Sequence, residues 1–264
     1  TNDGTITINS NGGTGVPRIQ ALADTTLDGS GEIFLDGTNN NFRSDIVPNG
    51  FTMTHDPNHT VRGNGQIIGI GAFVNNGRVE GNSAADPMRI RTRLEGTGAL
   101  KDVSIDFNFT GTVHAPGNSV GTVPLEGSYA MTHPLVTLEI EIGGLTAGTE
   151  HDELDGSGDP NSSISLAGIL KVLALDTGGY TPTAGDRFKI IQSANAISGT
   201  FNSVNFPDVL GGRFVTWQPV DYATDPNAVS LEIATVDFFD ADFDEDGDVD
   251  NDELGLWETA YARP

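Results

Sequence analysis

Three stretches, Leu27-Asp-Gly-Ser-Gly31, Val61-Arg-Gly-Asn-Gly65 and Leu94-Glu-Gly-Thr-Gly98, share one pattern: an apolar residue followed by two glycines at alternate positions. Their first glycines are spaced 34 and 33 residues apart, and apolar residues follow each copy. A constant period in a glycine-rich chain predicts a solenoid in which each repeat forms about one coil. Glycine suits the corners of such coils because it adopts positive φ without strain. The alternative is a chance recurrence in a sequence with 34 glycines.

Around these repeats, short apolar runs alternate with polar residues, and helical periodicity is nearly absent before residue 250. Alternation over a few residues, bounded by Gly, Asn and Asp, predicts β-strands. We therefore expect an all-β protein: a parallel β-solenoid (β-helix) with a β-rich C-terminal continuation or cap and a short α-helical EF-hand-like calcium tail. The alternating stretches are Thr5-Ile-Thr-Ile8, Glu32-Ile-Phe-Leu35, Leu138-Glu-Ile-Glu-Ile142, Phe188-Lys-Ile-Ile191 and Ser230-Leu-Glu-Ile233.

The character of the sequence changes near Val123, where the Gly-x-Gly phase stops and longer strand-like stretches begin. We expect solenoid coils over residues 1–122, a β-rich continuation or cap over 123–235, and a calcium module over 236–264. The continuation either widens the coils or closes them as a sandwich-like cap. A solenoid end exposes unpaired strand edges, which must be covered or paired with another strand.

The stretch Asp242-Phe-Asp-Glu-Asp-Gly-Asp-Val-Asp-Asn-Asp-Glu253 has the spacing of an EF-hand calcium loop. Carboxylates occupy the ligand positions, glycine stands where the loop turns sharply, and a glutamate closes it. The following Leu254–Tyr261 stretch fits two turns of helix. A solvated acidic tail is the alternative, but it accounts for neither the glycine nor the closing glutamate. The predicted Ca²⁺ ligands are Asp242, Asp244, Asp246, Asp248, Asp250 and Glu253.

The charge of the chain restricts its partners. Lys plus Arg is 13 against 37 for Asp plus Glu, a net charge of -24. Such a polyanion is not expected to bind nucleic acid, whose affinity rests on cationic side chains at phosphates, or an anionic membrane. There is no cysteine, and no apolar run reaches the length of a signal peptide or a membrane span. Because the chain begins at Thr1, we expect that a targeting segment has been removed or that this is a fragment, and we expect an extracellular or cell-surface location.

Several short motifs in order over about residues 110–235 resemble the passenger regions of bacterial autotransporter-like β-helix proteins. They are Val113-His-Ala-Pro-Gly-Asn-Ser-Val-Gly-Thr122, Gly127-Ser-Tyr129, Leu138-Glu-Ile-Glu-Ile-Gly-Gly144, Asp152-Glu-Leu154, Leu166-Ala-Gly-Ile-Leu170, Pro182-Thr-Ala-Gly-Asp-Arg-Phe-Lys-Ile190 and Ser198-Gly-Thr-Phe201. The tail resembles a single dockerin-type calcium repeat, where a full dockerin has two, as in secreted proteins of bacteria such as planctomycetes. The resemblance implies a secreted β-solenoid and a cohesin-like protein as a possible partner.

Catalytic motifs are few. Gly117-Asn-Ser-Val-Gly121 fits the G-x-S-x-G elbow of serine hydrolases, but strand-like residues follow it where that elbow needs a helix, so a β-corner is favoured. His55 and His59 are four residues apart, but Pro57 forbids the helix that would align them on zinc, so a polar loop is favoured.

Glycoside hydrolysis requires a pair of acids that face each other across the substrate. Two pairs are expected on one face of their strands: Asp102 with Asp106, and Glu139 with Glu141. A solvated face is the default for both pairs. A β-helix lyase would need a basic cluster, and the alternating arginines over residues 89–93 more often line an outer strand face. We therefore expect no enzyme.

The leading prediction is a secreted structural subunit, stabilised by calcium and assembling head to tail through β-edge pairing into a homo-polymer, for which Thr5–Ile8 is a strand ready to be donated to another copy. Head-to-tail contacts of this kind produce open filaments. The alternatives are an adhesive or anchoring module that docks a protein partner through the dockerin-like repeat and, ranked last, a carbohydrate-active β-helix enzyme.

Overall fold

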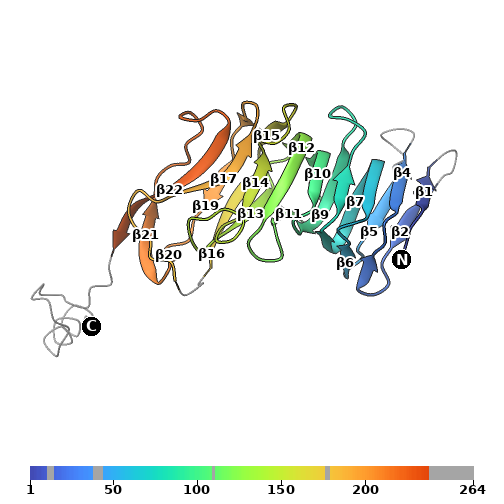
Figure 1. The fold of residues 1–264 in the computed structure, drawn as a ribbon, viewed down its shortest axis with the longest axis horizontal. Helices are drawn as coiled ribbons and strands as arrows, with labels where there is room; N and C mark the ends of the chain where they lie inside the picture. Colours follow the sequence, from blue (N-terminus) through green and yellow to red (C-terminus); the bar gives the residue numbers. More distant parts are fainter. Residues whose placement is uncertain (11–14, 38–43, 109–110, 176–178, 238–264) are drawn as a thin grey trace, which may run out of the picture.

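A computed structural model describes residues 1–10, 15–37, 44–108, 111–175 and 179–237. Over these ranges the protein is all-β and forms no helix, so none of the described segments is a helix that could cross a membrane. The strands stand side by side along the longest axis of the molecule (Figure 1). The predicted calcium module lies almost wholly outside the described residues.

Parallel strand pairs run in three rows along the molecule (Figure 1). Row 1 contains β1 (Thr5–Asn9), β4 (Glu32–Asp36), β7 (Thr60–Asn75), β8 (Arg78–Glu80), β10 (Ala99–Ile105), β12 (Thr122–Met131), β14 (Glu153–Gly156) and β17 (Arg187–Ser193). Row 2 contains β2 (Arg18–Gln20), β5 (Ser44–Val47), β9 (Met88–Glu95), β15 (Ser163–Leu166) and β18 (Ser198–Gly199). Parts of β7, β10 and β12 also belong to it. Row 3 contains β3 (Thr25–Leu27), β6 (Thr52–His55), parts of β7 and β9, and β11 (Thr112–His114), β13 (Val136–Ile142), β16 (Ile169–Ala174) and β19 (Ser203–Asn205).

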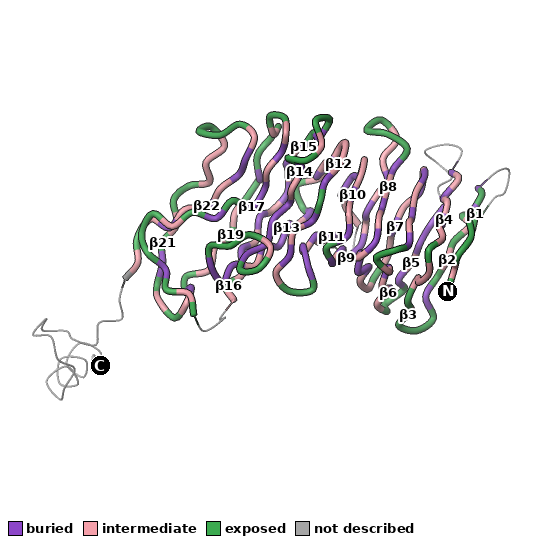
Figure 2. The backbone as a smooth tube through the Cα atoms, in the orientation of Figure 1, coloured by how far each residue is buried: buried purple, intermediate pink, exposed green. Residues whose placement is uncertain are grey.

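Each row stacks one column of inward-facing side chains, because strict parallel register puts alternate residues over one another. The row 2 column is Ile19, Ile46, Ile67, Ile90, Ile105 and Met131. Row 3 stacks Met53, Phe73, Leu94, His114, Leu138 and Leu170. Apart from Ile19, all of these are buried, and the buried stripe follows the strands in Figure 2. Each buried aliphatic side chain contributes about 1.5–3 kcal/mol, so the columns hold the strands together.

The spacing between stacked strands is not the 33–34 residues predicted from the glycine repeat. Bonded side chains on neighbouring strands are 27 residues apart at Thr5 and Glu32, and 21 apart at Asp45 and Gln66. The reason is that the three copies do not all mark the same corner. Gly29 and Gly96 precede row 1 strands, whereas Gly63 lies within β7 beside Leu35. All three have positive φ, which favours glycine. Glycine therefore recurs at each of these bends, whichever row the bend belongs to.

Parallel pairing continues beyond residue 122, with wider spacing. Glu139 and Lys171, on β13 and β16, are bonded across 32 residues. The pairing then reverses: β22 (Ala228–Asp237) is antiparallel to β17 and to β21 (Arg213–Trp217), which pairs in turn with β20 (Val209–Leu210). Parallel pairs at wider spacing are thus followed by antiparallel pairs towards the C-terminal end of the described residues.

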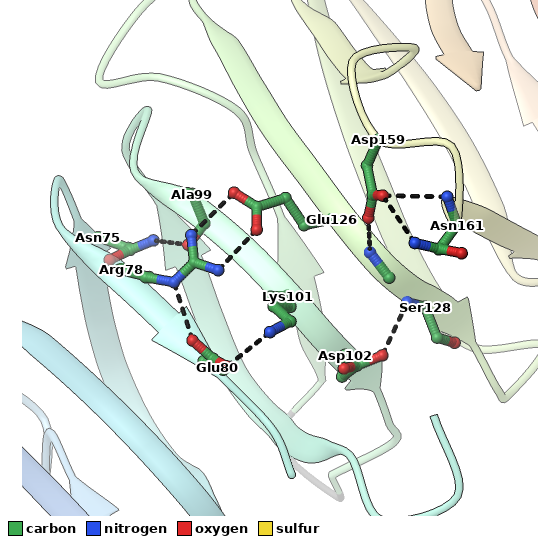
Figure 3. A network of polar contacts seen from close by, with 11 residues as sticks. Asn75, Arg78, Glu80, Ala99, Lys101, Asp102, Glu126, Ser128, Asp159 and Asn161 are labelled. Carbon is green, nitrogen blue, oxygen red and sulfur yellow. Dashed lines mark hydrogen bonds and ion pairs between the residues drawn. The ribbon is translucent and has the colours of Figure 1, made fainter. Parts of the chain in front are cut away.

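The outer face of row 1 carries a polar network between strands (Figure 3). Arg78 on β8 donates two hydrogen bonds to Glu126 on β12 and one to Glu80. Glu80 also accepts one from Lys101 on the intervening strand β10. The network therefore ties three successive row 1 strands together from outside, opposite the apolar column.

Candidate functional site

The predicted calcium ligands lie outside the described residues, so their arrangement stays a prediction. They are Asp242, Asp244, Asp246, Asp248, Asp250 and Glu253. Within the described part of the chain, no group of three or more His, Asp or Glu side chains is placed to hold a metal ion. Two other features stand out there: the ends of the strand rows and a cleft lined by acids.

The N-terminal end of the molecule is a layer of three strands that are paired on one side. Among the described residues, β1 pairs with β4, β2 with β5 and β3 with β6, each in parallel. Their other edges face away from the sheet, at the N-terminal end of the rows in Figure 1. A strand edge of this kind presents backbone N–H and C=O groups to which another strand can bond.

Side chains at this end belong to the core columns but are not fully covered. Ile6 stacks on Ile33, which is buried, yet Ile6 is 44% exposed. Ile19 and Leu27, on β2 and β3, are half-buried for the same reason. These residues are apolar because they face inward, and they are exposed because the stack ends. The N-terminal end is therefore a layer with exposed apolar side chains, whose strands have a strand partner on one side among the described residues.

The N-terminal residues are held to the next strand layer by a local clamp. The Thr1 ammonium lies 2.6 Å from Asp28 Oδ1. Asn2 donates from Nδ2 to the Glu32 carbonyl at 3.0 Å and to His59 Nε2 at 3.1 Å, and its Oδ1 accepts from Gly4 N at 3.2 Å. The clamp fixes β1 in register on β4.

His59 is part of a buried chain of polar side chains. Its Nδ1 lies 3.0 Å from His55 Nε2, and His55 Nδ1 lies 2.7 Å from Asn75 Oδ1. Both rings are buried. Burial lowers the pKa of His55 to about 4 and also lowers that of His59. The sequence favoured a polar loop over a zinc pair; the loop exists, but the two imidazoles bind each other inside the fold, which their spacing did not indicate.

The C-terminal end differs from the N-terminal end. Row 1 is closed there by antiparallel β22, whereas β18 and β19 in rows 2 and 3 are each paired in parallel on one side among the described residues. Val209 and Phe214, opposite each other on the β20–β21 hairpin, are both exposed. The two ends are therefore not equivalent, but each leaves parallel strands with one partner.

A small cleft of about 130 Å³ lies on the outer face of row 3 and is lined by Arg93, Glu95, Ser119, Glu139, Glu141 and Asp152, among others. Glu139 accepts from Arg93 Nη1 at 2.8 Å and from Lys171 Nζ at 2.9 Å. Burial acts to raise the pKa of Glu139, but these two cations outweigh it and lower that pKa. As predicted, Glu139 and Glu141 share one strand face.

Asp152 is the most buried acid of the cleft. Its Oδ1 accepts from Gly121 N and its Oδ2 from Glu141 N, both at 2.8 Å. Burial raises its pKa to about 8 in spite of these two N–H groups. Burial and then the charge of Glu139 raise the pKa of Glu141, whose Oε2 has no hydrogen-bond partner in the described structure. Sequence reasoning missed Asp152 because its partners come from β13 and from the turn before β12.

Ser119 also lines the cleft, but not as a nucleophile elbow. Its turn is followed directly by β12 rather than by a helix. His114 is buried in row 3 with its Nδ1 2.8 Å from the Tyr129 hydroxyl. The structure agrees with the β-corner predicted from the sequence.

The other predicted side chains lie apart from the cleft. Asp102 falls at a register shift in β10, with φ of 50°, and accepts from Ser128 N at 3.0 Å. Asp106 bonds Phe107 N and the Thr132 hydroxyl instead. The two acids therefore hold different partners, and Asp106 lies just beyond the end of β10, so their sharing of a strand face stays a prediction. Arg89, Arg91 and Arg93 occupy the outer positions of β9, as expected.

No protein-family model matches this chain, and no curated protein sequence is found to match it. The geometry of the two ends and of the cleft is therefore what indicates function.

Proposed function

We propose that this protein is a secreted or cell-surface structural protein: a β-solenoid subunit, stabilised by calcium at its C-terminal tail, that assembles head to tail through its β-edges into an extracellular fibre or layer. The observation that carries the proposal is the N-terminal layer, where Ile6 is 44% exposed on an edge strand paired on one side. A second copy that pairs there would bury this apolar side chain and satisfy the backbone edge.

The three rows of parallel pairs support the solenoid. A chain that passes through the rows in turn and stacks each strand on the one before it winds into coils. Head-to-tail contact matches strands of the same rows: β2 and β3 of one copy would meet β18 and β19 of the next. In row 1, β1 would lie against β22, the strand with which that row ends. Because the two faces are different, such a contact does not close on itself and produces a filament.

Calcium enters the proposal through the predicted loop over residues 242–253. The eight carboxylates of this stretch, with no cation among them, repel one another, and a bound divalent ion relieves that repulsion. The ion would rigidify the tail of each subunit or sit at the junction between subunits. Assembly is then expected to require calcium.

Electron microscopy and sedimentation of the full chain, with millimolar calcium and with a chelator, test the proposal. We expect polymers in calcium and their loss in the chelator. Ile6→Lys should abolish polymers, since it places a charge in the layer that the second copy covers. Leu135→Lys is the matched control, because Leu135 is 54% exposed and directly precedes β13, away from both ends of the rows. A monodisperse wild-type monomer in calcium would refute end-to-end assembly.

Docking of a partner protein through the dockerin-like repeat is the alternative for the C-terminal tail. A pull-down with residues 236–264 separates the two proposals, because an isolated tail is sufficient for docking but not for forming fibres.

The cleft favours one further candidate, a carbohydrate-active enzyme, because it is lined both by Asp152, whose pKa is raised, and by Glu139, whose pKa is lowered. An acid with a raised pKa close to an ionised carboxylate is the arrangement that glycoside hydrolysis uses. Incubation with acidic and neutral polysaccharides tests it, and we expect no cleavage.

A further inference from the structure

The buried imidazoles of His55 and His59 form a chain in which every hydrogen has one position. Asn75 Oδ1 only accepts, so the Nδ1 of His55 donates to it across 2.7 Å. His55 Nε2 is then an acceptor, and the Nδ1 of His59, 3.0 Å away, must donate to it. His59 Nε2 is left as an acceptor for the amide of Asn2. The chain is complete when both rings are neutral.

An added proton has no acceptor within this chain. A proton on His55 Nε2 would face the N–H of His59. If the hydrogen of His59 moved from its Nδ1 to its own Nε2, the new Nε2–H would face the NH₂ of the Asn2 amide. Turning the Asn2 amide over would point its oxygen at the Glu32 carbonyl and its NH₂ at Gly4 N–H, so both bonds that hold the amide would be lost. The conflict therefore falls on Asn2, the outermost member of this series of hydrogen-bonded side chains.

We propose that the Asn2–His59–His55–Asn75 chain is an acid-sensitive latch: protonation of the imidazoles releases Asn2 and, with it, strand β1 from the edge of β4. This deepens the end-pairing function proposed above, on which its biological use rests. Release of β1 removes the strand that a second copy would pair with, so assembly is lost in acid.

The groups around the two rings fit this role. The ring of Phe73, on β7, lies against His55 with a centroid separation of 5.7 Å. The charged groups that face the rings are Asp56 in the same turn, Asp28 after β3, and the N-terminal ammonium. The two carboxylates favour an imidazolium and the ammonium opposes it, but burial outweighs all three and keeps both rings neutral. An imidazolium is accommodated only once the N-terminal residues move away.

The pH range follows from the direction of these shifts. Both histidines have a pKa below 6.5 in the closed state and return towards 6.5 when β1 is released, so the released state binds more protons. The latch is therefore fully closed above about pH 6.5 and weakens as the pH falls towards 4. At pH 5.0, the return of one histidine pKa from about 4 to about 6.5 raises the equilibrium constant for release of β1 roughly thirtyfold.

Amide hydrogen exchange of the full chain, at concentrations where it is monomeric, tests the latch. After correction for the intrinsic exchange rate, the protection of Thr5–Asn9 should fall about thirtyfold between pH 7.5 and 5.0, while that of β13 does not change. His59→Gln should remove most of this pH dependence. His133→Gln is the matched control: His133 stacks on Phe107 far from the latch, and this variant should respond as wild type does.

Ring nitrogen NMR of the wild-type protein needs no variant and gives a second measurement. We expect both imidazoles to carry hydrogen on Nδ1 at pH 7.5 and to titrate together with the loss of β1 protection. Unchanged β1 protection at pH 5.0, equal loss in His59→Gln, or rings that titrate near 6.5 in the closed state would each overturn the latch. These outcomes concern the monomer and leave end-pairing intact, whereas absence of polymers at pH 7.5 would refute end-pairing alone.

Discussion

Arg78 and Glu126 are 48 residues apart in the sequence, yet they form a two-point ion pair, Nη1 to Oε1 at 2.8 Å and Nη2 to Oε2 at 2.6 Å. The pair spans β10, the strand between theirs (Figure 3). Backbone pairing links each row 1 strand only to its neighbours, whereas this side-chain pair links next-nearest ones. It therefore stabilises the stack against the loss of any single strand contact.

Glu126→Gln should lower the free energy of unfolding by about 1 kcal/mol, because Arg78 keeps Glu80 but loses its bidentate partner. The loss should shrink in 1 M salt, since both side chains are partly exposed. Urea unfolding at low and high salt measures it. Asp208→Asn, an exposed acid near the C-terminal cap, is the control. An equal change in unfolding free energy for the two variants would show that the Arg78–Glu126 pair contributes no more to stability than the change in net charge does.

Acid should weaken the same pair. The hydrogen bonds from Arg78 lower the pKa of Glu126 below its ordinary value. A carboxyl with a lowered folded pKa contributes stability that is present above its unfolded pKa and is lost as the pH falls. The difference between wild type and Glu126→Gln should therefore begin to shrink near pH 4 and should continue to shrink as the pH falls through the lowered folded pKa. A difference that stays constant as the pH falls below 4 would contradict the ion-pair account.

Glycine at the corners can be tested with two substitutions that differ in the space around them. Gly96 and Gly50 both have positive φ, so alanine at either costs about 1 kcal/mol. A methyl group on Gly96 would also meet the backbone of Asn75, whereas one on Gly50 would have no atom within 4 Å. Gly96→Ala should thus lower the thermal midpoint clearly more than Gly50→Ala. Equal shifts would mean that the corner at Gly96 relaxes freely.

Strand positions followed from the sequence because the alternation of apolar residues is local. The predicted Thr5–Ile8 and Glu32–Leu35 stretches coincide with β1 and β4. The stacking spacing did not follow, because a positive φ selects glycine at every corner and the motif does not say which corner it marks. Strand direction is also non-local: Ser230–Ile233 is a strand, but only its partner Phe188 shows it to be antiparallel.

The candidate sites were less predictable than the strands. The calcium loop is encoded by twelve consecutive residues, so the sequence suffices to propose it. The cleft brings Asp152 to Arg93 and Glu139, which lie on separate strands. The latch likewise needs Asn2 beside His59, a proximity created by the parallel pairing of strands far apart in the sequence. Neither arrangement leaves a local pattern in the sequence.

The apolar columns predict a steep dependence on side-chain volume. Ile90 is buried between Ile67 and Ile105, so Ile90→Ala should cost about 2–5 kcal/mol and Ile90→Val about 1 kcal/mol. Ile70→Ala is the control, because Ile70 is 63% exposed and should change stability by less than about 0.5 kcal/mol. Denaturant unfolding measures all three. A small loss for Ile90→Ala would show that row 2 is not closely packed there.

Calcium titration addresses the C-terminal loop directly. Calorimetry of the full chain should detect one tight site, and removal of calcium should lower thermal stability by mass action. Glu253→Gln should weaken binding by roughly tenfold or more, because the closing glutamate supplies two ligand oxygens in such loops. Glu150→Gln, at an exposed turn remote in sequence, should not. Equal affinity of the two variants would place the ion elsewhere.

The carboxyl of Asp152 should titrate near pH 8, far above an ordinary aspartate, because it is buried beside Glu141. Its folded pKa is raised, so the folded state holds a proton that the unfolded state has lost, and this acid should reduce stability as the pH rises from about 4 to 8. Carbon-13 NMR of the Asp carboxyls gives the titration, and Asp152→Asn identifies the resonance. That variant should also flatten the decline in stability between pH 6 and 8, whereas Asp155→Asn should retain it, since Asp155 is a half-buried neighbour that accepts a hydrogen bond from Ser157 N. If Asp152 titrates near 4, the two backbone N–H bonds from Gly121 and Glu141 outweigh the effect of burial on its pKa. Asp152 is then ionised at neutral pH and cannot donate the proton that glycoside chemistry requires.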